Sequence, residues 1–462
     1  MLLAVVLPFA KAASHVSFPP MTLSVPPRFV TGSPLRHVIV MASTGAVGLV
    51  AVFVVDLINL FYISLLGEPA IAAAVGFAGV VGFFHTSVCI GLMIGITATV
   101  SRKIGAGHGA DARRLASHSL LLMAAIAALL ALATLVFLAP LLAALGARGE
   151  VAVLAQRYLT VTMPSVPLLG VGMASSALLR SVGDARRAMV VTLGAAAVTA
   201  VLDPLFIFYF RMGLDGAAVV SVISRSVLIA IGLQGVARVH HLLAPVQRAL
   251  FRSDALALFK VAGPAVLTNV ATPVGAAFVT HSVAQFGASA VAGQATVDRL
   301  TPVAFGLIYA LSGAVGPILA QNLGAKRFDR VRQTLRASLG FMLVAVAAAW
   351  LLLAVLQGPL TRAFSLEGQA ALLLQAFCSW LAAGFFFAGA LFVANAAFNN
   401  LGHPLWSTAF NWARATLGTI PLAWWGAHYG PVHVLAGQAV GTAVFGALAM
   451  WVAFRLTASL GA

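Results

Sequence analysis

The feature of this sequence that excludes most is its shortage of charge. Only 8% of its 462 residues are Asp, Glu, Lys or Arg, whereas 61% are hydrophobic. A soluble protein uses about a quarter charged residues to cover its surface, so a soluble fold is excluded. The chain is therefore expected to be an integral membrane protein whose solvent is mostly the lipid bilayer.

Cysteine and acidic residues are scarce as well. Cys89 and Cys378 both fall in apolar segments, and neither has a partner at metal-site spacing. This excludes a disulfide framework and predicts no metal site. The 11 acidic residues against 27 Lys and Arg give a net charge of +16. The cations are scattered between apolar runs and form no stripe that could follow phosphates, so nucleic acid is not an expected partner.

Long apolar runs are abundant, and short turns rich in Gly, Pro and charge separate them. A helix of about 20 such residues spans a bilayer, and the pattern predicts an all-α integral membrane fold with twelve transmembrane helices. The predicted spans are 38–66, 70–101, 115–146, 151–179, 187–210, 214–236, 258–286, 288–320, 333–358, 369–398, 404–427 and 431–455.

The distribution of cations predicts the orientation. With the amino terminus placed in the cytoplasm, 20 of the 27 Lys and Arg fall on the cytoplasmic side. Cytoplasmic loops are enriched in Lys and Arg, so we expect a multi-pass protein of the cell inner (cytoplasmic) membrane with both termini cytoplasmic. Residues 1–35, which are apolar and then rich in proline, are expected to form a cytoplasmic N-terminal tail.

The chain also repeats itself. Gly67 and Gly105 of the first half are 38 residues apart, and Gly287 and Gly324 of the second half are 37 apart. Each half has a further glycine 78 residues on, and similar residues follow the equivalent glycines. This register predicts two pseudo-symmetric six-helix lobes, 36–236 and 258–462, joined by a cytoplasmic linker, 237–257. Between parallel repeats of this kind a substrate path is expected.

Six charged residues remain inside the predicted spans, where each costs about 2.5–3.5 kcal/mol on insertion scales. They are Asp56, Asp203, Asp298, Arg225, Arg299 and Arg414.

Five polar residues of the first lobe are expected to meet at one level of the membrane. At 1.5 Å per residue, Asp203 and Ser221 both lie roughly 13 Å from the turn near Met212. Asn59 lies at a similar depth, one helical turn from Asp56, and Thr199 shares a face with Asp203. Carboxylate, amide and hydroxyl oxygens suit Na⁺, and a buried carboxylate suits a proton. The predicted cation-coupling residues are therefore Asp56, Asn59, Thr199, Asp203 and Ser221.

The remaining charges allow two interpretations. Asp298 and Arg299 could pair with other helices, for example Asp298 with Arg414, or they could form a substrate or secondary cation site. Arg225 is expected to be structural, and a single histidine such as His85 is more often a hydrogen-bonded core residue than a proton relay.

The sequence resembles the multidrug and toxic compound extrusion (MATE) antiporters over about residues 36–455. The resemblance is carried by FYISLLGEPAIAAAVGF, RKIGAGHGADARR, LLRSVGDARRAM, LDPLFIFYFRMGLDGAAVVSVIS, AQFGASAVAGQAT and AQNLGAKRFDRVR. It implies a twelve-helix exporter that exchanges a drug-like or lipophilic cationic substrate for inward-moving H⁺ or Na⁺. It implies no enzyme activity and no organic cofactor, and we expect a monomer.

The resemblance also implies a cation site in the first lobe. Similar members have an Asn and an Asp on the first helix, an Asn and an Asp four apart on the fifth, and a Thr on the sixth. Here Asn59 stands at the first-helix Asp position and Asp56 at the Asn position, so the pair is exchanged along one face. Asp203 keeps the fifth-helix Asp, Thr199 replaces its Asn, and Ser221 represents the Thr.

Two other function classes remain as alternatives. A lipid-linked oligosaccharide flippase of the same superfamily would need several arginines in a central cavity, where only Arg225, Arg299 and Arg414 are available. An intramembrane enzyme would need a nucleophile–base pair or a metal motif such as H-E-x-x-H, and the sequence contains no such motif.

Overall fold

The computed structural model describes residues 25–460, and within them every regular element is a helix. The first lobe, called the N-lobe, contains α2 (Pro34–Leu65), α3 (Pro69–Gly105), α4 (Gly109–Val136), α5 (Leu138–Ala144), α6 (Gly149–Thr162), η1 (Met163–Ser165), α7 (Val166–Ser181), α8 (Ala185–Pro204), η2 (Leu205–Tyr209), α9 (Gly213–Leu233) and η3 (Gln234–Val239). The second lobe, called the C-lobe, contains α10 (Arg248–Ala284), α11 (Ala288–Ala304), α12 (Gly306–Gly324), α13 (Phe328–Ala363), α14 (Gly368–Ser379), η4 (Leu381–Gly384), α15 (Phe385–Leu401), α16 (Pro404–Ala413), η5 (Arg414–Thr419), α17 (Ile420–Gly426) and α18 (Pro431–Ala458).

The prediction of twelve spans is confirmed, because each predicted span coincides with a helical stretch. Eleven helices of the described chain are long and apolar enough to cross a membrane. The twelfth, predicted at 404–427, is helical over 404–426 but contains a π-helical segment, η5, that divides it into three elements. The span predicted at 288–320 is likewise divided, at Phe305, shortly after Pro302 removes a backbone donor.

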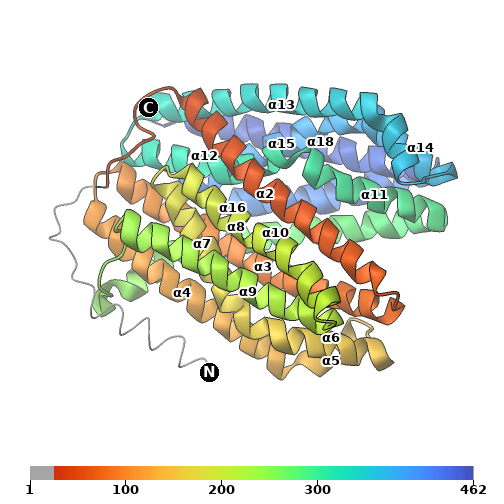
Figure 1. Ribbon diagram of the computed structural model, residues 1–462. Helices are drawn as coiled ribbons and strands as arrows, with labels where there is room; N and C mark the ends of the chain where they lie inside the picture. The colour runs from red at the N-terminus through yellow and green to blue at the C-terminus, as the bar shows by residue number, and fades with distance from the viewer. Residues whose placement is uncertain (1–24, 461–462) are drawn as a thin grey trace.

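The two lobes lie side by side with their long helices running in the same general direction (Figure 1). Helices α13, α15 and α18 follow the upper side of that view, and α4, α5 and α6 follow the lower side. The lobes pack on each other mainly through α3 against α10 and through α12 against α2 and α3. We call the end of the bundle where α2 begins and α18 ends the terminal end, and the opposite end the far end.

Two glycines make a reciprocal contact between the lobes at the terminal end. A Cβ atom on Gly105 of α3 would overlap the backbone of Gln321 in α12. A Cβ atom on Gly324 of α12 would overlap the backbone carbonyl of Arg102 in α3. Gly105 meets the residue three positions before Gly324, and Gly324 meets the residue three positions before Gly105. This reciprocity is the pseudo-two-fold symmetry expected of two repeats. The close approach of the two backbones closes the terminal end of the interface between the lobes.

The sequence predicts a cytoplasmic N-terminal tail over residues 1–35, but the described part of this segment is packed against the protein. Residues 1–24 lie outside the described chain, but Phe29 is only 2% exposed and packs in the core of the C-lobe. The proline-rich composition favoured a tail, but one buried aromatic side chain is enough to anchor so short a segment.

The backbone of Phe29 bonds to two helices of the C-lobe at the terminal end, and one of its partners bonds on to the N-lobe. Its N–H donates to Gln321 Oε1 over 3.0 Å, and its carbonyl oxygen accepts from Arg330 Nη2 of α13 over 3.0 Å. Gln321 also donates through Nε2 to the carbonyl oxygen of Ser181 in α7, over 2.7 Å. This chain of bonds runs from α13 and α12 of the C-lobe to α7 of the N-lobe, so the N-terminal segment strengthens the contact between the lobes.

The predicted linker, 237–257, is much shorter in the structure. The π-helical segment η3 continues to Val239, and α10 already begins at Arg248. The cations Arg248 and Arg252 lie on the exposed face of this helix, whose other face is buried at Asp254 and Leu258. Only residues 240–247 connect the lobes without regular structure.

This short connection is docked on the N-lobe along its length. His240 Nε2 lies 2.8 Å from Asp184 Oδ2, and the N–H of Ala244 donates to Ser117 Oγ over 2.8 Å. Burial alone would raise the pKa of Asp184, but its hydrogen bonds from Arg187 and His240 outweigh that effect and hold the pKa below its ordinary value. The connection therefore moves with the N-lobe rather than swinging freely.

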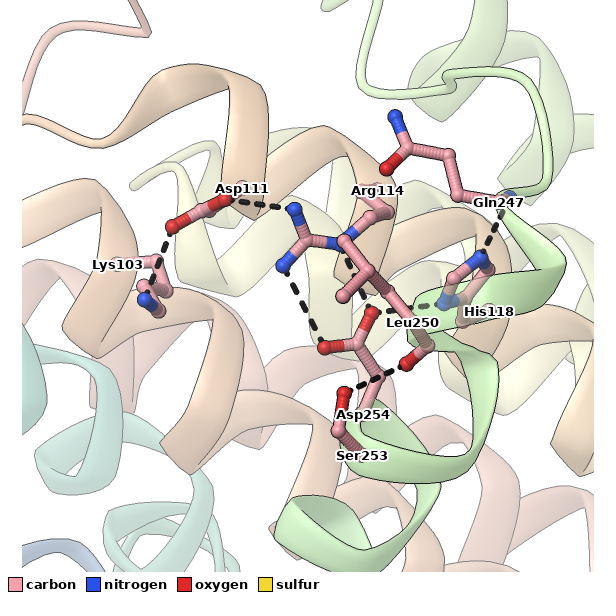
Figure 2. A network of polar contacts seen from close by, with 8 residues as sticks. All are labelled: Lys103, Asp111, Arg114, His118, Gln247, Leu250, Ser253 and Asp254. Carbon is pink, nitrogen blue, oxygen red and sulfur yellow. Dashed lines mark hydrogen bonds and ion pairs between the residues drawn. The ribbon is translucent and has the colours of Figure 1, made fainter.

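A polar network fastens the start of α10 to α4 (Figure 2). Asp254 Oδ2 accepts from Arg114 Nε over 3.0 Å and from His118 Nδ1 over 2.7 Å. The N–H of Gln247 donates to His118 Nε2 over 3.1 Å. That backbone donor fixes the tautomer, since Nε2 must be free to accept and Nδ1 must carry the proton toward Asp254.

We expect Asp254→Ala to loosen this junction without unfolding the lobes. Asp254 is 7% exposed, and a hydrogen bond to a charged group contributes about 1.5–3 kcal/mol. Because every 1.4 kcal/mol is a factor of ten, trypsin should cleave after the exposed Arg248 and Arg252 about tenfold faster. Asp329→Ala, which removes an exposed carboxylate 3.8 Å from Arg327, is the control and should leave the rate unchanged. Equal rates in both variants would contradict the role of this network.

Candidate functional site

The N-lobe contains a buried carboxylate with one unused oxygen. Asp203 of α8 is 1% exposed, and Asn59 Nδ2 of α2 donates to its Oδ2 over 2.6 Å. Asp203 Oδ1 is buried and has no hydrogen-bond partner. A buried polar atom without a partner carries a free-energy cost that nearly all proteins avoid. A proton or a small cation at Oδ1 would remove that cost.

The local backbone explains how α8 presents this side chain. Asp203 is followed by Pro204, which ends the α-helical hydrogen-bond pattern, and the chain continues as the π-helical segment η2. The residue lies 18 positions after the start of α8, about 27 Å along the helix and therefore in the far half of the bundle. This agrees with the depth predicted from the sequence.

Asp56 is the second carboxylate of the same region. It lies on α2, one helical turn before Asn59, and it is exposed in the structure, whereas Asp203 is buried. The two carboxylates are close enough to act electrostatically on each other. Two carboxylates that repel each other favour the binding of one cation or proton between them.

The two predicted hydroxyl residues bond to their own helices. Thr199 Oγ1 donates to the carbonyl oxygen of Ala195 over 3.1 Å, one turn before Asp203 on the same helix. Ser221 Oγ donates to the carbonyl oxygen of Ala217 over 3.0 Å and lies 3.4 Å from Tyr158 Oη. The structure thus brings Asn59 and Asp203 into direct contact. A coupling role stays a prediction for all five residues.

The charges of the C-lobe are arranged differently from what the sequence suggested. Asp298 and Arg299 of α11 are both exposed. The suggested pair of Asp298 with Arg414 is wrong, since none of the ion pairs in the described chain joins them. Arg414 instead donates through Nη2 to Thr272 Oγ1 of α10 over 3.1 Å. The helices carrying Asp298 and Arg414 approach other partners more closely than each other, which spacing along the chain could not reveal.

Two predicted structural residues have the expected environment. Arg225 Nη1 donates to the carbonyl oxygen of Thr162 and to Ser165 Oγ, both over 2.8 Å, where the 3₁₀ turn η1 interrupts the fourth span. His85 is 1% exposed, with Nδ1 2.8 Å from the carbonyl oxygen of Val81 and Nε2 3.1 Å from Thr134 Oγ1. Both cysteines are buried and free, as the sequence predicted for core residues.

The close contact between the lobes at the terminal end is a feature that the sequence did not predict. In the sequence, Gly105 and Gly324 indicate only that the two halves are repeats. The adjacent amides Gln321 and Asn322, which interrupt an apolar run just before Gly324, are a signal that could have indicated a polar contact between the lobes.

A contact between parallel repeats at one end and a buried ionisable residue inside one lobe are features of membrane transporters built from repeats. The MatE family matches residues 46–205 and 264–425, one segment in each lobe. The chain belongs to the MatE family, the MATE transporters of the MOP superfamily. Members of this family are transporters, so the chain is not an enzyme.

Curated relatives differ in the substrates that their names state. The chain is 32% identical over 404 residues to the FAD transporter of Shewanella oneidensis. This match covers 85% of this chain and 88% of that protein. It is 24% identical over 314 residues to the multidrug export protein MepA of Staphylococcus aureus, covering 66% of this chain and 68% of that protein.

Solved structures have the same fold. The bent form of the MATE transporter VcmN from Vibrio cholerae matches with a TM-score of 0.86 at 26% identity, covering 92% of this chain and 97% of VcmN. A MOP superfamily transporter from Pyrococcus furiosus matches with a TM-score of 0.88 at 20% identity, covering 96% and 100% of the two chains. The second match supports the fold alone.

Proposed function

We propose that this protein is a cation-coupled antiporter that exports organic molecules by alternating access, with its terminal end in the cytoplasm of the cell and its body in the inner membrane. The observation that carries the coupling is Asp203, whose Oδ1 is buried without a partner while Asn59 holds Oδ2. The orientation rests on the sequence, which puts 20 of the 27 Lys and Arg on the cytoplasmic side of the predicted topology.

The coupling follows from neutralisation of the Asp203 carboxylate by a bound cation. A proton or Na⁺ on Oδ1 would cancel the charge of Asp203 and relieve its repulsion by Asp56. Asn59 can stay bonded to Oδ2 in both states, so the site gains or loses its cation without losing the contact between α2 and α8. If one state of the two lobes binds the cation better, the cation gradient shifts the populations of those states, and substrate release is linked to cation entry.

The lobes supply the two states. The contact of Gly105 with α12 and the bonds of Phe29 close the terminal end. In the proposed orientation the closed end faces the cytoplasm. Separation of α3 from α12 would then admit substrate from the cytoplasm.

Two substrate classes are candidates. The first is the drug-like or lipophilic cationic class expected from the sequence, which agrees with the name of the MepA relative. The second is FAD, for which the relative of higher identity is named. Arg414, a cation inside the C-lobe, favours the second class.

The test is transport by the purified full-length protein in proteoliposomes, with ethidium or FAD inside and imposed pH and Na⁺ gradients applied one at a time. We expect one inward cation gradient to accelerate loss of at least one substrate at least about fivefold over protein-free liposomes. Equal rates with and without each gradient, for both substrates, would refute cation-coupled export.

A further inference from the structure

An uncompensated guanidinium lies halfway across the C-lobe. Arg414 is 10 residues after the start of α16 and 12 before the end of α17, or about 15 and 18 Å along the helix. A charge at this depth costs about 2.5–3.5 kcal/mol on insertion scales, and such residues face a cavity or a partner. In transporters built from repeats, substrates bind near the bilayer midplane at the interface between the repeats.

The structure provides Arg414 with only one side-chain partner. Its Nη2 donates to Thr272 Oγ1 over 3.1 Å, whereas its Nε is buried without an acceptor. None of the ion pairs in residues 25–460 includes Arg414. A guanidinium has five N–H donors in a planar fork that matches the oxygens of a carboxylate or a phosphate. Most of the hydrogen-bond donors of Arg414 are therefore available to a ligand.

An aromatic cluster near Arg414 crosses the boundary between the lobes. Tyr309 of α12 is close enough to interact electrostatically with Arg414. The ring of Tyr309 lies 6.4 Å from that of Phe53, which is on α2 of the other lobe. It also lies 5.7 Å from Phe385 and 5.5 Å from Phe392, both on α15. Arg414 therefore lies within electrostatic range of Tyr309, whose aromatic cluster includes rings from both lobes.

The backbone at this position is unusual as well. The π-helical segment η5 begins at Arg414, and Thr419 Oγ1 donates to the carbonyl oxygen of Arg414 over 3.0 Å. Short π segments inside α-helices are frequent at functional sites. The equivalent span of the N-lobe has its own π segment, η2, which follows Asp203. Each lobe thus has a π segment next to a charged residue, a carboxylate in one and a cation in the other.

We propose that Arg414 binds a phosphate or carboxylate group of the exported molecule, while Tyr309, Phe385 and Phe392 receive a planar aromatic ring of the same molecule. This inference rests on the proposed function and narrows its substrate to an anionic aromatic compound, the class to which FAD belongs. The two lobes then divide the work, since the N-lobe binds the coupling cation and the C-lobe binds the substrate anion.

The experiment measures transport of three probes in proteoliposomes: FAD, riboflavin and ethidium. FAD and riboflavin share the isoalloxazine ring, but only FAD has phosphates, and ethidium is a planar cation. Arg414→Gln should reduce FAD transport at least about tenfold and change ethidium transport less than about twofold. Arg414→Lys, which keeps the charge but loses the planar fork, should reduce FAD transport by an intermediate factor. Arg362→Gln, an exposed cation at the far end of α13, is the control.

The outcomes separate this inference from the proposed function. Equal losses for all probes in Arg414→Gln would mean that Arg414 only supports the fold, and unchanged FAD transport would mean that it does not bind the substrate. Either result would overturn the inference, as would gradient-driven export of ethidium with no FAD transport by the wild type. Cation-coupled export itself would survive each of these results.

Discussion

Asp203→Asn is expected to abolish gradient-driven transport, to no more than about a tenth of the wild-type rate. The asparagine has nearly the same shape, and its amide oxygen can still accept from Asn59 Nδ2, so the contact of α2 with α8 is kept. The amide cannot take up a proton or carry the charge that attracts Na⁺ at the position of Oδ1. Coupling should therefore be lost while the folded protein remains.

The measurement is substrate loss from proteoliposomes under the gradient that drives the wild type. The matched control is Asp215→Asn, which removes a carboxylate near the start of α9 that pairs with Arg157 instead of lying in the coupling region. This control should transport at the wild-type rate. A fully active Asp203→Asn protein would remove the basis for coupling in the N-lobe.

Gly105→Val should have a comparably large effect through a different cause. The new side chain would overlap the backbone of Gln321, which no rotamer change can relieve. Overpacking typically costs 1–3 kcal/mol, and every 1.4 kcal/mol shifts an equilibrium tenfold. The state closed at the terminal end would be depopulated by about tenfold or more, and transport should fall accordingly. Gly324→Val should act in the same way, because the contact is reciprocal.

A cysteine placed at Ser101 reports on this closure. Ser101 is fully buried and lies one turn before Gly105 on the same face of α3. A maleimide should label the cysteine slowly in the otherwise unchanged protein and much faster in Gly105→Val. Gly340→Val is the control, since a Cβ there meets open space. Slow labelling in both valine variants would show that the glycine contact does not hold the lobes together.

Much of the fold could be predicted because lipid imposes simple rules on a chain. Every backbone donor must be satisfied inside the membrane, so an apolar run such as 333–358 can only be a helix. The prediction erred where charged residues occur in a helix outside the apolar region, as at Arg248 and Arg252, where α10 begins ten residues before the predicted start. It erred again at Phe29, because the burial of one side chain in a distant helix pair leaves no periodic signal.

The site was predictable in part for the same reason. A carboxylate in an apolar span must have a function or a partner, which singled out Asp56, Asp203 and Asp298. Spacing along one helix correctly related Asp56 to Asn59, because residues three apart share a face. Spacing could not show that Asn59 bonds to Asp203, or that Arg414 bonds to Thr272 and not to Asp298, because each of these facts depends on how helices rotate and pack against each other.

The sequence by itself therefore determined the class of protein, the number of its spans and its two-lobed repeat, since hydrophobic length and internal register are properties of the chain alone. The tertiary structure decided which charges are neutralised and which are left unused, and where two backbones touch. Asp203 and Arg414 are both rare charges inside an apolar span. Only the packing of α2 on α8 and of α10 on η5 shows that each keeps an unpartnered polar atom.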